Sequence, residues 1–163
     1  MSSLTIRPAT RDDLSSILPI YDSARRFMAS RGNPTQWPST YPGRQMLCED
    51  IDKGQLYVIC NPHICGVFVF ALGNDPTYAQ ITGGAWLNNA PYGTIHRIAS
   101  NGTTKGIFSA ALAFCRGICP NIRIDTHRDT LPMHAAINRA GFTYCGIITA
   151  ADGTPRLAYQ ASF

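Results

Sequence analysis

The stretch from Thr103 to Phe108 is the part of the sequence best suited to binding an anion. It joins a predicted strand to a predicted helix, and the first backbone N–H groups of a helix have no partner within the helix. The helix dipole attracts negative charge to the same end. Gly106 allows close approach of a phosphate, Lys105 adds a positive charge, and Thr103 and Thr104 add hydroxyl groups. The segment therefore predicts a phosphate site.

The strand before this loop carries two residues that could exchange protons. Alternate residues of a strand share one face, which would place Tyr92, Thr94, His96 and Ile98 together. Imidazole titrates near neutral pH and suits a general base. A histidine in a strand can equally be a hydrogen-bonded structural residue. His96 is therefore a candidate with two interpretations, and Tyr92 is a second candidate.

His127 follows the predicted strand at residues 121–125, at the carboxyl end where open α/β sheets often bind ligands. Asp125 lies two residues earlier on the same face and could orient the imidazole. The alternative is an Asp–His pair that only braces the loop. His63 in a turn and His134 in a helix have no partner nearby in the sequence, and both are expected at the surface.

The pattern of apolar residues predicts the helices and strands that position these segments. Thr10 and Asp13 resemble a capping box that opens a helix, Pro19 should kink or split it, and Gly32 should end it. Residues 33–55 are rich in turn formers. Strands are expected at 4–8, 56–60, 64–71, 94–100, 121–125, 142–148 and 155–160, with a weaker one at 78–82, and further helices at 106–119 and 131–140. This order implies an α/β fold with a mixed sheet and helices on its faces.

Composition limits the class of protein. A chain of 163 residues, 45% hydrophobic and 15% charged, is typical of one globular domain spanning residues 1–163. The net charge of +4 is scattered, which disfavours a nucleic-acid partner. No signal-like or membrane-spanning apolar run is present, so a cytoplasmic location without membrane contact is expected. The six cysteines are expected to be reduced and mostly buried, without metal-ligand spacing.

The strongest resemblance to a known family lies in residues 122–148, IRIDTHRDTLPMHAAINRAGFTYCGII. This segment resembles the strand, helix and Gly-Phe hairpin of the GNAT acetyltransferase superfamily that line the pantetheine arm of acetyl-coenzyme A (acetyl-CoA). The similarity in order runs from IRPAT near the start, through the QW and YP segment, to RLAYQ near the end. The resemblance implies a GNAT-like acyl-CoA N-acyltransferase fold with a mostly antiparallel sheet. It also implies acetyl transfer to the primary amine of a small molecule or peptide by direct attack.

The resemblance further implies where acetyl-CoA binds. The fourth and fifth strands would splay apart around it, with pantetheine paired to the fourth strand and the pyrophosphate on the glycine loop. The residues implied to contact acetyl-CoA are Ile98, Ala99, Ser100, Thr103, Thr104, Lys105, Gly106, Ile107, Phe108, Thr130 and Met133. Those implied to contact the acceptor are Trp37, Tyr41 and His127. The two aromatic residues could instead close the core.

Three positions depart from the family pattern. Phe108 replaces a residue with almost no side chain, Thr130 stands where relatives often carry Asn, and Ile137 stands where many carry the Tyr that protonates the leaving thiolate. Glu49 is the only glutamate, so the usual carboxylate base is missing from the fourth strand. His96, Tyr92 or water would then take the proton.

These departures keep an alternative open, namely a catalytically weak or inactive acyl-CoA-binding domain that serves as a sensor or partner module. The expected partner is a small amine acceptor, no metal is expected, and a homodimer is left open.

Overall fold

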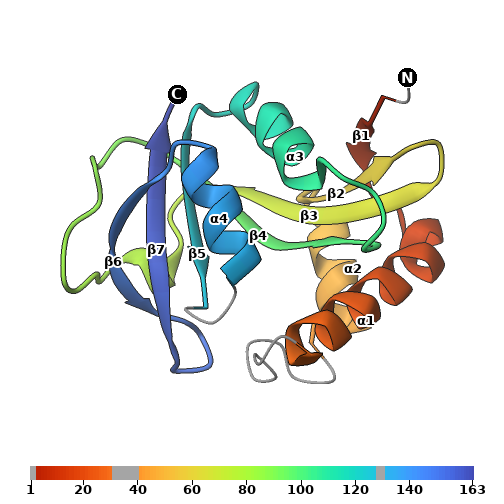
Figure 1. The fold of residues 1–163 in the computed structure, drawn as a ribbon, viewed down its shortest axis with the longest axis horizontal. Helices are drawn as coiled ribbons and strands as arrows, with labels where there is room; N and C mark the ends of the chain where they lie inside the picture. Colours follow the sequence, from red (N-terminus) through yellow and green to blue (C-terminus); the bar gives the residue numbers. More distant parts are fainter. Residues whose placement is uncertain (1–2, 31–40, 128–130) are drawn as a thin grey trace. The chain divides into compact units, whose positions relative to one another are not determined.

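The computed structural model describes residues 3–30, 41–127 and 131–163 (Figure 1). Trp37 and Thr130 therefore lie outside the described residues. The chain divides into two compact units. The first comprises Met1–Phe70 and Arg97–Phe114, and the second comprises Ala71–His96 and Cys115–Phe163. The expectation of one domain over residues 1–163 stays a prediction.

The first unit is built on an antiparallel hairpin with helices around it. Strand β1 pairs antiparallel with β2, and β2 pairs antiparallel with β3. The elements that contribute to this unit are β1 (Thr5–Pro8), the 3-10 turn η1 (Arg11–Asp13), α1 (Leu14–Ser30), α2 (Arg44–Asp52), β2 (Leu56–Cys60), β3 (Ile64–Leu72), the second half of β4 (Gly93–Ser100) and α3 (Ile107–Arg116). All of these except α2 and the short turn η1 were expected from the apolar pattern.

Close packing holds α3 against the hairpin. The ring of Phe114 contacts the ring of Tyr57, with centroids 4.9 Å apart, and also that of Phe68 at 6.1 Å. A Cβ added at Gly66 would lie 3.0 Å from Cδ1 of Ile107, so only glycine lets the start of the helix approach this strand. Figure 1 shows α3 on one side of the hairpin and α1 and α2 on the other.

Two features of this unit differ from expectation. Helix α2 was missed because its single buried apolar residue, Leu47, is followed on the same face by the buried carboxylate of Asp50. Helix α1 runs unbroken through Pro19, so the split does not occur, and the kink stays a prediction. Proline leaves the carbonyl of Ser15 without its helical donor, but both residues are exposed, so water can supply the hydrogen bond.

The second unit centres on β5, β6 and β7. Strand β7 lies between β5 and β6 and pairs antiparallel with both (Figure 1). Its elements are the 3-10 turn η2 (Pro76–Tyr78), the first half of β4, β5 (Asn121–Thr126), α4 (Leu131–Arg139), β6 (Thr143–Thr149) and β7 (Pro155–Ser162). Strand β4 pairs parallel with β5 only at Gly93–Ile122 and Thr94–Arg123. These pairs lie near the start of both strands, and the expected splay of the two strands stays a prediction.

The weak strand predicted at residues 78–82 is wrong. Asp75 caps the turn η2, whose first residue is Pro76, and only Thr82 forms an isolated bridge, with Ile147. A proline at the first position and a capping carboxylate both favour a helical turn over an extended strand. The connection from β3 to β4 therefore begins as a 3-10 turn.

Buried polar groups fasten this connection to the sheet of the second unit. The amide of Asn121 donates to Oδ1 of Asn88 at 3.0 Å, and Nη2 of Arg123 donates to the backbone oxygen of Asn88 at 2.9 Å. The Arg123 guanidinium lies 4.1 Å from the ring centre of Trp86 and 3.9 Å from that of Tyr92. Such cation–π contacts hold the aromatic residues of the connection against β5.

The strand order along the seven-stranded sheet is β1-β2-β3-β4-β5-β7-β6. The sheet is mixed and mostly antiparallel, as expected. The cysteines are free thiols; Cys60, Cys65, Cys115 and Cys145 are buried, while Cys48 and Cys119 are partly buried. Among the described residues, no helix combines the length and apolar character needed to cross a bilayer. The same residues contain no cluster of three or more His, Cys, Asp or Glu suited to a metal ion.

Candidate active site

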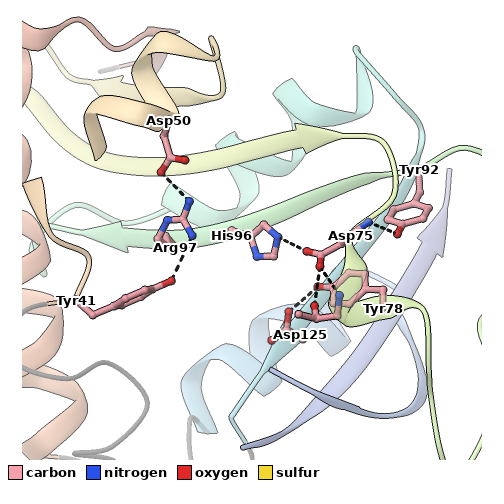
Figure 2. A network of polar contacts seen from close by, with 9 residues as sticks. Tyr41, Asp50, Asp75, Tyr78, Tyr92, His96, Arg97 and Asp125 are labelled. Atoms are coloured by element: carbon pink, nitrogen blue, oxygen red, sulfur yellow. Dashed lines mark hydrogen bonds and ion pairs between the residues drawn. The ribbon is translucent and has the colours of Figure 1, made fainter. Parts of the chain in front are cut away.

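In the second unit, His96 is held by the carboxylate of Asp75 (Figure 2). Nε2 of His96 lies 2.9 Å from Oδ2 of Asp75. The other carboxylate oxygen accepts two hydrogen bonds from Thr77, one from its backbone N–H at 2.9 Å and one from its hydroxyl at 2.7 Å. The histidine side chain is 26% exposed and that of Asp75 is 18% exposed. Both side chains are thus partly shielded from solvent.

The ionisation of Asp75 determines which nitrogen of His96 carries the proton. Burial acts to raise the pKa of Asp75, but hydrogen bonds from His96 and Thr77 outweigh it and lower the pKa to about 2. An ionised carboxylate only accepts hydrogen bonds, so Nε2 must donate. In the neutral imidazole the lone pair then sits on Nδ1, for which the described part of the chain offers no hydrogen-bond partner.

Tyr92 lies beside this pair and supports it through a hydrogen bond and ring packing. Its hydroxyl oxygen accepts the backbone N–H of Asp75 at 2.8 Å, and its ring is buried in a cluster with Tyr78. These contacts account for a tyrosine at position 92 through packing and through support of Asp75. A role for Tyr92 as base stays a prediction.

A second carboxylate of this unit is bonded to a buried tyrosine. The hydroxyl of Tyr78 donates to Oδ1 of Asp125 at 2.5 Å (Figure 2). Burial, followed by the negative charge of Asp125, raises the pKa of Tyr78 well above its ordinary value. Neither Asp75 nor Tyr78 was predicted as a site residue, although an Asp followed by Pro is a recognisable sequence signal for a capped turn.

In the first unit, Arg97 forms a separate network (Figure 2). Its Nη2 lies 2.7 Å from Oδ2 of Asp50, and its Nη1 donates to the hydroxyl of Tyr41 at 3.3 Å. The hydroxyl of Tyr21 donates to the backbone oxygen of Arg97 at 2.7 Å. Tyr41 is thus part of an internal network, and its contact with an acceptor stays a prediction.

The backbone of Arg97 changes the expected pattern of β4. Its φ of 49° lies in the left-handed region, which non-glycine residues rarely adopt. Regular alternation of side chains is therefore interrupted between His96 and Ile98. The expected shared face of His96 and Ile98 required regular alternation, which the φ of Arg97 interrupts.

The glycine loop keeps part of its predicted donor set. Oδ1 of Asn101 accepts the backbone N–H groups of Thr103 and Thr104, each at 3.0 Å. Of the backbone donors predicted between Thr103 and Phe108, the first two are therefore already used within the loop. Within the described chain, the backbone N–H groups of Lys105, Gly106 and Ile107 have no acceptor. Gly106 has a φ of 81°, and no atom lies within 4 Å of the position of an added Cβ.

His134 lies on α4, as expected, but its imidazole has two hydrogen-bond partners outside the helix. Its Nδ1 lies 3.0 Å from the hydroxyl of Tyr159, and its Nε2 lies 3.1 Å from the backbone oxygen of His127. The prediction that His134 is a surface residue without a partner is wrong, because the partner on β7 is distant in sequence. The expected contacts of His127 with an acceptor and of Met133 with acetyl-CoA stay predictions.

The order of elements and the mixed, mostly antiparallel seven-stranded sheet define the acyl-CoA N-acyltransferase fold. A crystal structure of a GNAT-family acetyltransferase from Streptococcus agalactiae 2603 matches with a TM-score of 0.85 and 31% sequence identity, covering 98% of this chain and 95% of that chain. The chain belongs to the GNAT family of acetyltransferases. Acetyl transfer is accordingly the general activity that this membership supports.

More distant structures share the fold alone. A GNAT-family acetyltransferase from Listeria monocytogenes 4b F2365 matches with a TM-score of 0.71 and 17% identity over 100% of this chain and 98% of that chain. A ribosomal-protein-alanine N-acetyltransferase from Brucella melitensis matches with a TM-score of 0.62 and 17% identity over 98% and 99% of the two chains. No protein-family model and no curated protein sequence matches the chain.

Proposed function

We propose that the protein transfers the acetyl group of acetyl-CoA to the primary amine of a small molecule or peptide by direct attack. His96 serves as the general base. The observation that carries this proposal is the imidazole of His96, tied through Nε2 to Asp75 and without a described partner at Nδ1. We expect the protein to act in the cytoplasm. Its oligomeric state, monomer or homodimer, is a question for experiment.

The glycine loop fits a phosphate-bearing co-substrate. Helix α3 begins at Ile107, and its first N–H groups are joined by those of Lys105 and Gly106. The space beside Gly106 is open, so a phosphate oxygen can approach its backbone. We infer that this loop holds the pyrophosphate of acetyl-CoA. Ile98, Ala99 and Ser100 are the residues that would pair with its pantetheine arm.

The chemistry requires a base because an amine is protonated at neutral pH. Nδ1 of His96 takes a proton from the acceptor ammonium, and the freed lone pair attacks the carbonyl carbon of the thioester. The carbon–sulfur bond breaks, the thiolate leaves, and the new amide nitrogen loses a second proton. The thiolate takes up one proton, so the reaction releases one net proton.

The source of the thiolate proton differs from the family pattern. Ile137 is fully buried and apolar, so its side chain cannot supply a proton. We propose that solvent or the imidazolium of His96 supplies it. This difference also motivates the second candidate function, an acyl-CoA-binding domain without turnover.

A thiol-release assay separates the two functions. Acetyl-CoA is offered with amino acids, polyamines, aminoglycosides and peptides, while calorimetry follows acetyl-CoA binding. Turnover with one of these amines supports the transferase, whereas binding without turnover of any of them supports the binding domain.

The role of His96 is tested with a matched histidine variant. His96→Ala should lower kcat roughly 10²- to 10⁴-fold and leave KM for acetyl-CoA nearly unchanged. His63→Ala is the control, because His63 lies in an exposed turn. An effect of His96→Ala below about threefold would assign His96 a structural role.

A further inference from the structure

The connection between β3 and β4 brings a carboxylate to the histidine of β4. Asp75 and His96 are separated by 21 positions in the chain, yet Oδ2 and Nε2 lie 2.9 Å apart. The backbone of Asp75 is fixed as well, since its N–H donates to the hydroxyl of Tyr92 at 2.8 Å. Both the main chain and the side chain of Asp75 are therefore held in place.

The two oxygens of the Asp75 carboxylate have different partners. Oδ1 accepts both hydrogen bonds from Thr77, and Oδ2 faces His96. Both Thr77 groups are donors, so the atom at the Oδ1 position must be an acceptor. This arrangement leaves Oδ2 alone to interact with the imidazole.

We infer that Asp75 is a positioning residue for His96. Its carboxylate accepts the Nε2 proton, fixes the tautomer with its lone pair on Nδ1, and stabilises the imidazolium that forms when Nδ1 takes a proton. The benefit to catalysis rests on the proposed function. The inferred tautomer of His96 does not depend on that function. The same logic governs Ser-His-Asp triads, where the carboxylate orients the imidazole without taking its proton.

Asp75→Asn gives a sharp test because it should reverse the tautomer. The amide oxygen must take the Oδ1 position to accept the hydrogen bonds from Thr77, which turns the NH₂ group toward His96. The amide then donates to Nε2, so the neutral imidazole carries its proton on Nδ1. Asn is as good an N-cap as Asp, so the turn η2 should survive.

Asp152 supplies a matched control. Its Oδ1 also accepts from a threonine two residues on, from the backbone N–H of Thr154 at 2.9 Å and from its hydroxyl at 2.6 Å. Among the described residues, no histidine is bonded to this carboxylate. Asp152→Asn therefore makes the same carboxylate-to-amide change beside a threonine, at a site that does not contact His96.

The first measurement is ¹⁵N NMR of the imidazole nitrogens, at a pH about two units above the ordinary titration range of histidine. The protein has four histidines, and the His96 signals are assigned by their loss in His96→Ala. We expect the Nε2–H tautomer in the parent and in Asp152→Asn, and the Nδ1–H tautomer in Asp75→Asn. An Nδ1–H form in the parent, or no change in Asp75→Asn, would overturn the inference.

The second measurement is steady-state kinetics with acetyl-CoA and the amine of the panel that turns over fastest. Asp75→Asn should lower kcat roughly 10²- to 10⁴-fold with KM for acetyl-CoA within about twofold, while Asp152→Asn keeps both. Full activity of Asp75→Asn with a reversed tautomer would refute the catalytic benefit. Absence of turnover in the parent would refute the proposed function, and the NMR result would still decide whether Asp75 positions His96.

Discussion

Tyr78 and Asp125 are joined by a hydrogen bond of 2.5 Å between the phenol and Oδ1 of the carboxylate. Tyr78 comes from the turn η2 and Asp125 from β5, so the bond ties the connection that carries Asp75 to the sheet of the second unit. Trp86 adds to this anchor, because its Nε1 donates to the backbone oxygen of Tyr78 at 3.0 Å. Support for Asp75 therefore depends on contacts beyond its immediate neighbours.

Replacing Tyr78 by Phe should destabilise the protein by about 1–2 kcal/mol, because the ring keeps its packing while the Asp125 carboxylate loses a donor. The comparison is Tyr144→Phe: Tyr144 is 49% exposed, so this change should alter the unfolding free energy by less than about 0.5 kcal/mol. Urea unfolding measures both. Equal effects would show that the buried hydroxyl contributes no more than an exposed one.

Helix α2 offers a paired test of buried and exposed ion pairs. Asp50→Ala leaves the guanidinium of Arg97 without its carboxylate, where the two side chains are only 8% and 16% exposed. The expected cost is about 3 kcal/mol. Asp52→Ala breaks the pair with Arg11, in which the side chains are 60% and 61% exposed, and should cost less than about 1 kcal/mol. Comparable losses in urea unfolding would show that the lower exposure of the Asp50–Arg97 pair does not increase its contribution to stability.

Acid stability should depend on Asp13. Hydrogen bonding from Arg7 lowers the pKa of Asp13 from 3.8 to about 2, against the opposing effect of burial. A carboxyl with a lowered folded pKa stabilises the fold above its unfolded pKa and loses that effect as pH falls toward the folded value. The contribution should therefore disappear between about pH 4 and pH 2. Because Arg7 is 48% exposed, we expect about 1 kcal/mol.

Asp13→Asn tests this dependence. The variant should be less stable than the parent at neutral pH, and the difference should shrink toward pH 2, as followed by urea unfolding across the pH range. Asp12→Asn, at the exposed neighbouring position, is the control. A constant difference at every pH would mean that the amide alters packing and that ionisation is not the cause.

The strands and the helices α1, α3 and α4 could be predicted because their apolar residues repeat with a clear period. Helix α2 could not, because a buried aspartate occupies its inward face and pairs with Arg97, 47 positions away. The turn η2 was hidden by the apolar residues Tyr78 and Ile81, which suggested a strand. A distant partner thus determined α2, whereas the local cap of Asp75 and Pro76 determined η2.

The sequence predicted one residue type of the candidate site, a histidine, but not the partners and backbone geometry around it. His96 stood out because imidazole suits proton transfer, but nothing near it in sequence indicates Asp75 as its partner. The positive φ of Arg97 was equally hidden, since arginine has no preference for that region. Spacing along a strand can predict shared faces only where the strand is regular.

The final prediction concerns acetyl-CoA and the loop before α3. Gly106→Ala and Gly153→Ala place a Cβ at similar positive φ angles, 81° and 84°, and neither new atom meets another within 4 Å. Both variants should therefore lose about 1 kcal/mol of stability from backbone strain. Only the Cβ at Gly106 should obstruct a phosphate at the N-terminus of α3, weakening acetyl-CoA binding by about tenfold, or about 1.4 kcal/mol, in calorimetry. For the same reason acetyl-CoA should raise the Tm of the parent and of Gly153→Ala more than that of Gly106→Ala. Equal dissociation constants for the two variants would place the pyrophosphate away from Gly106.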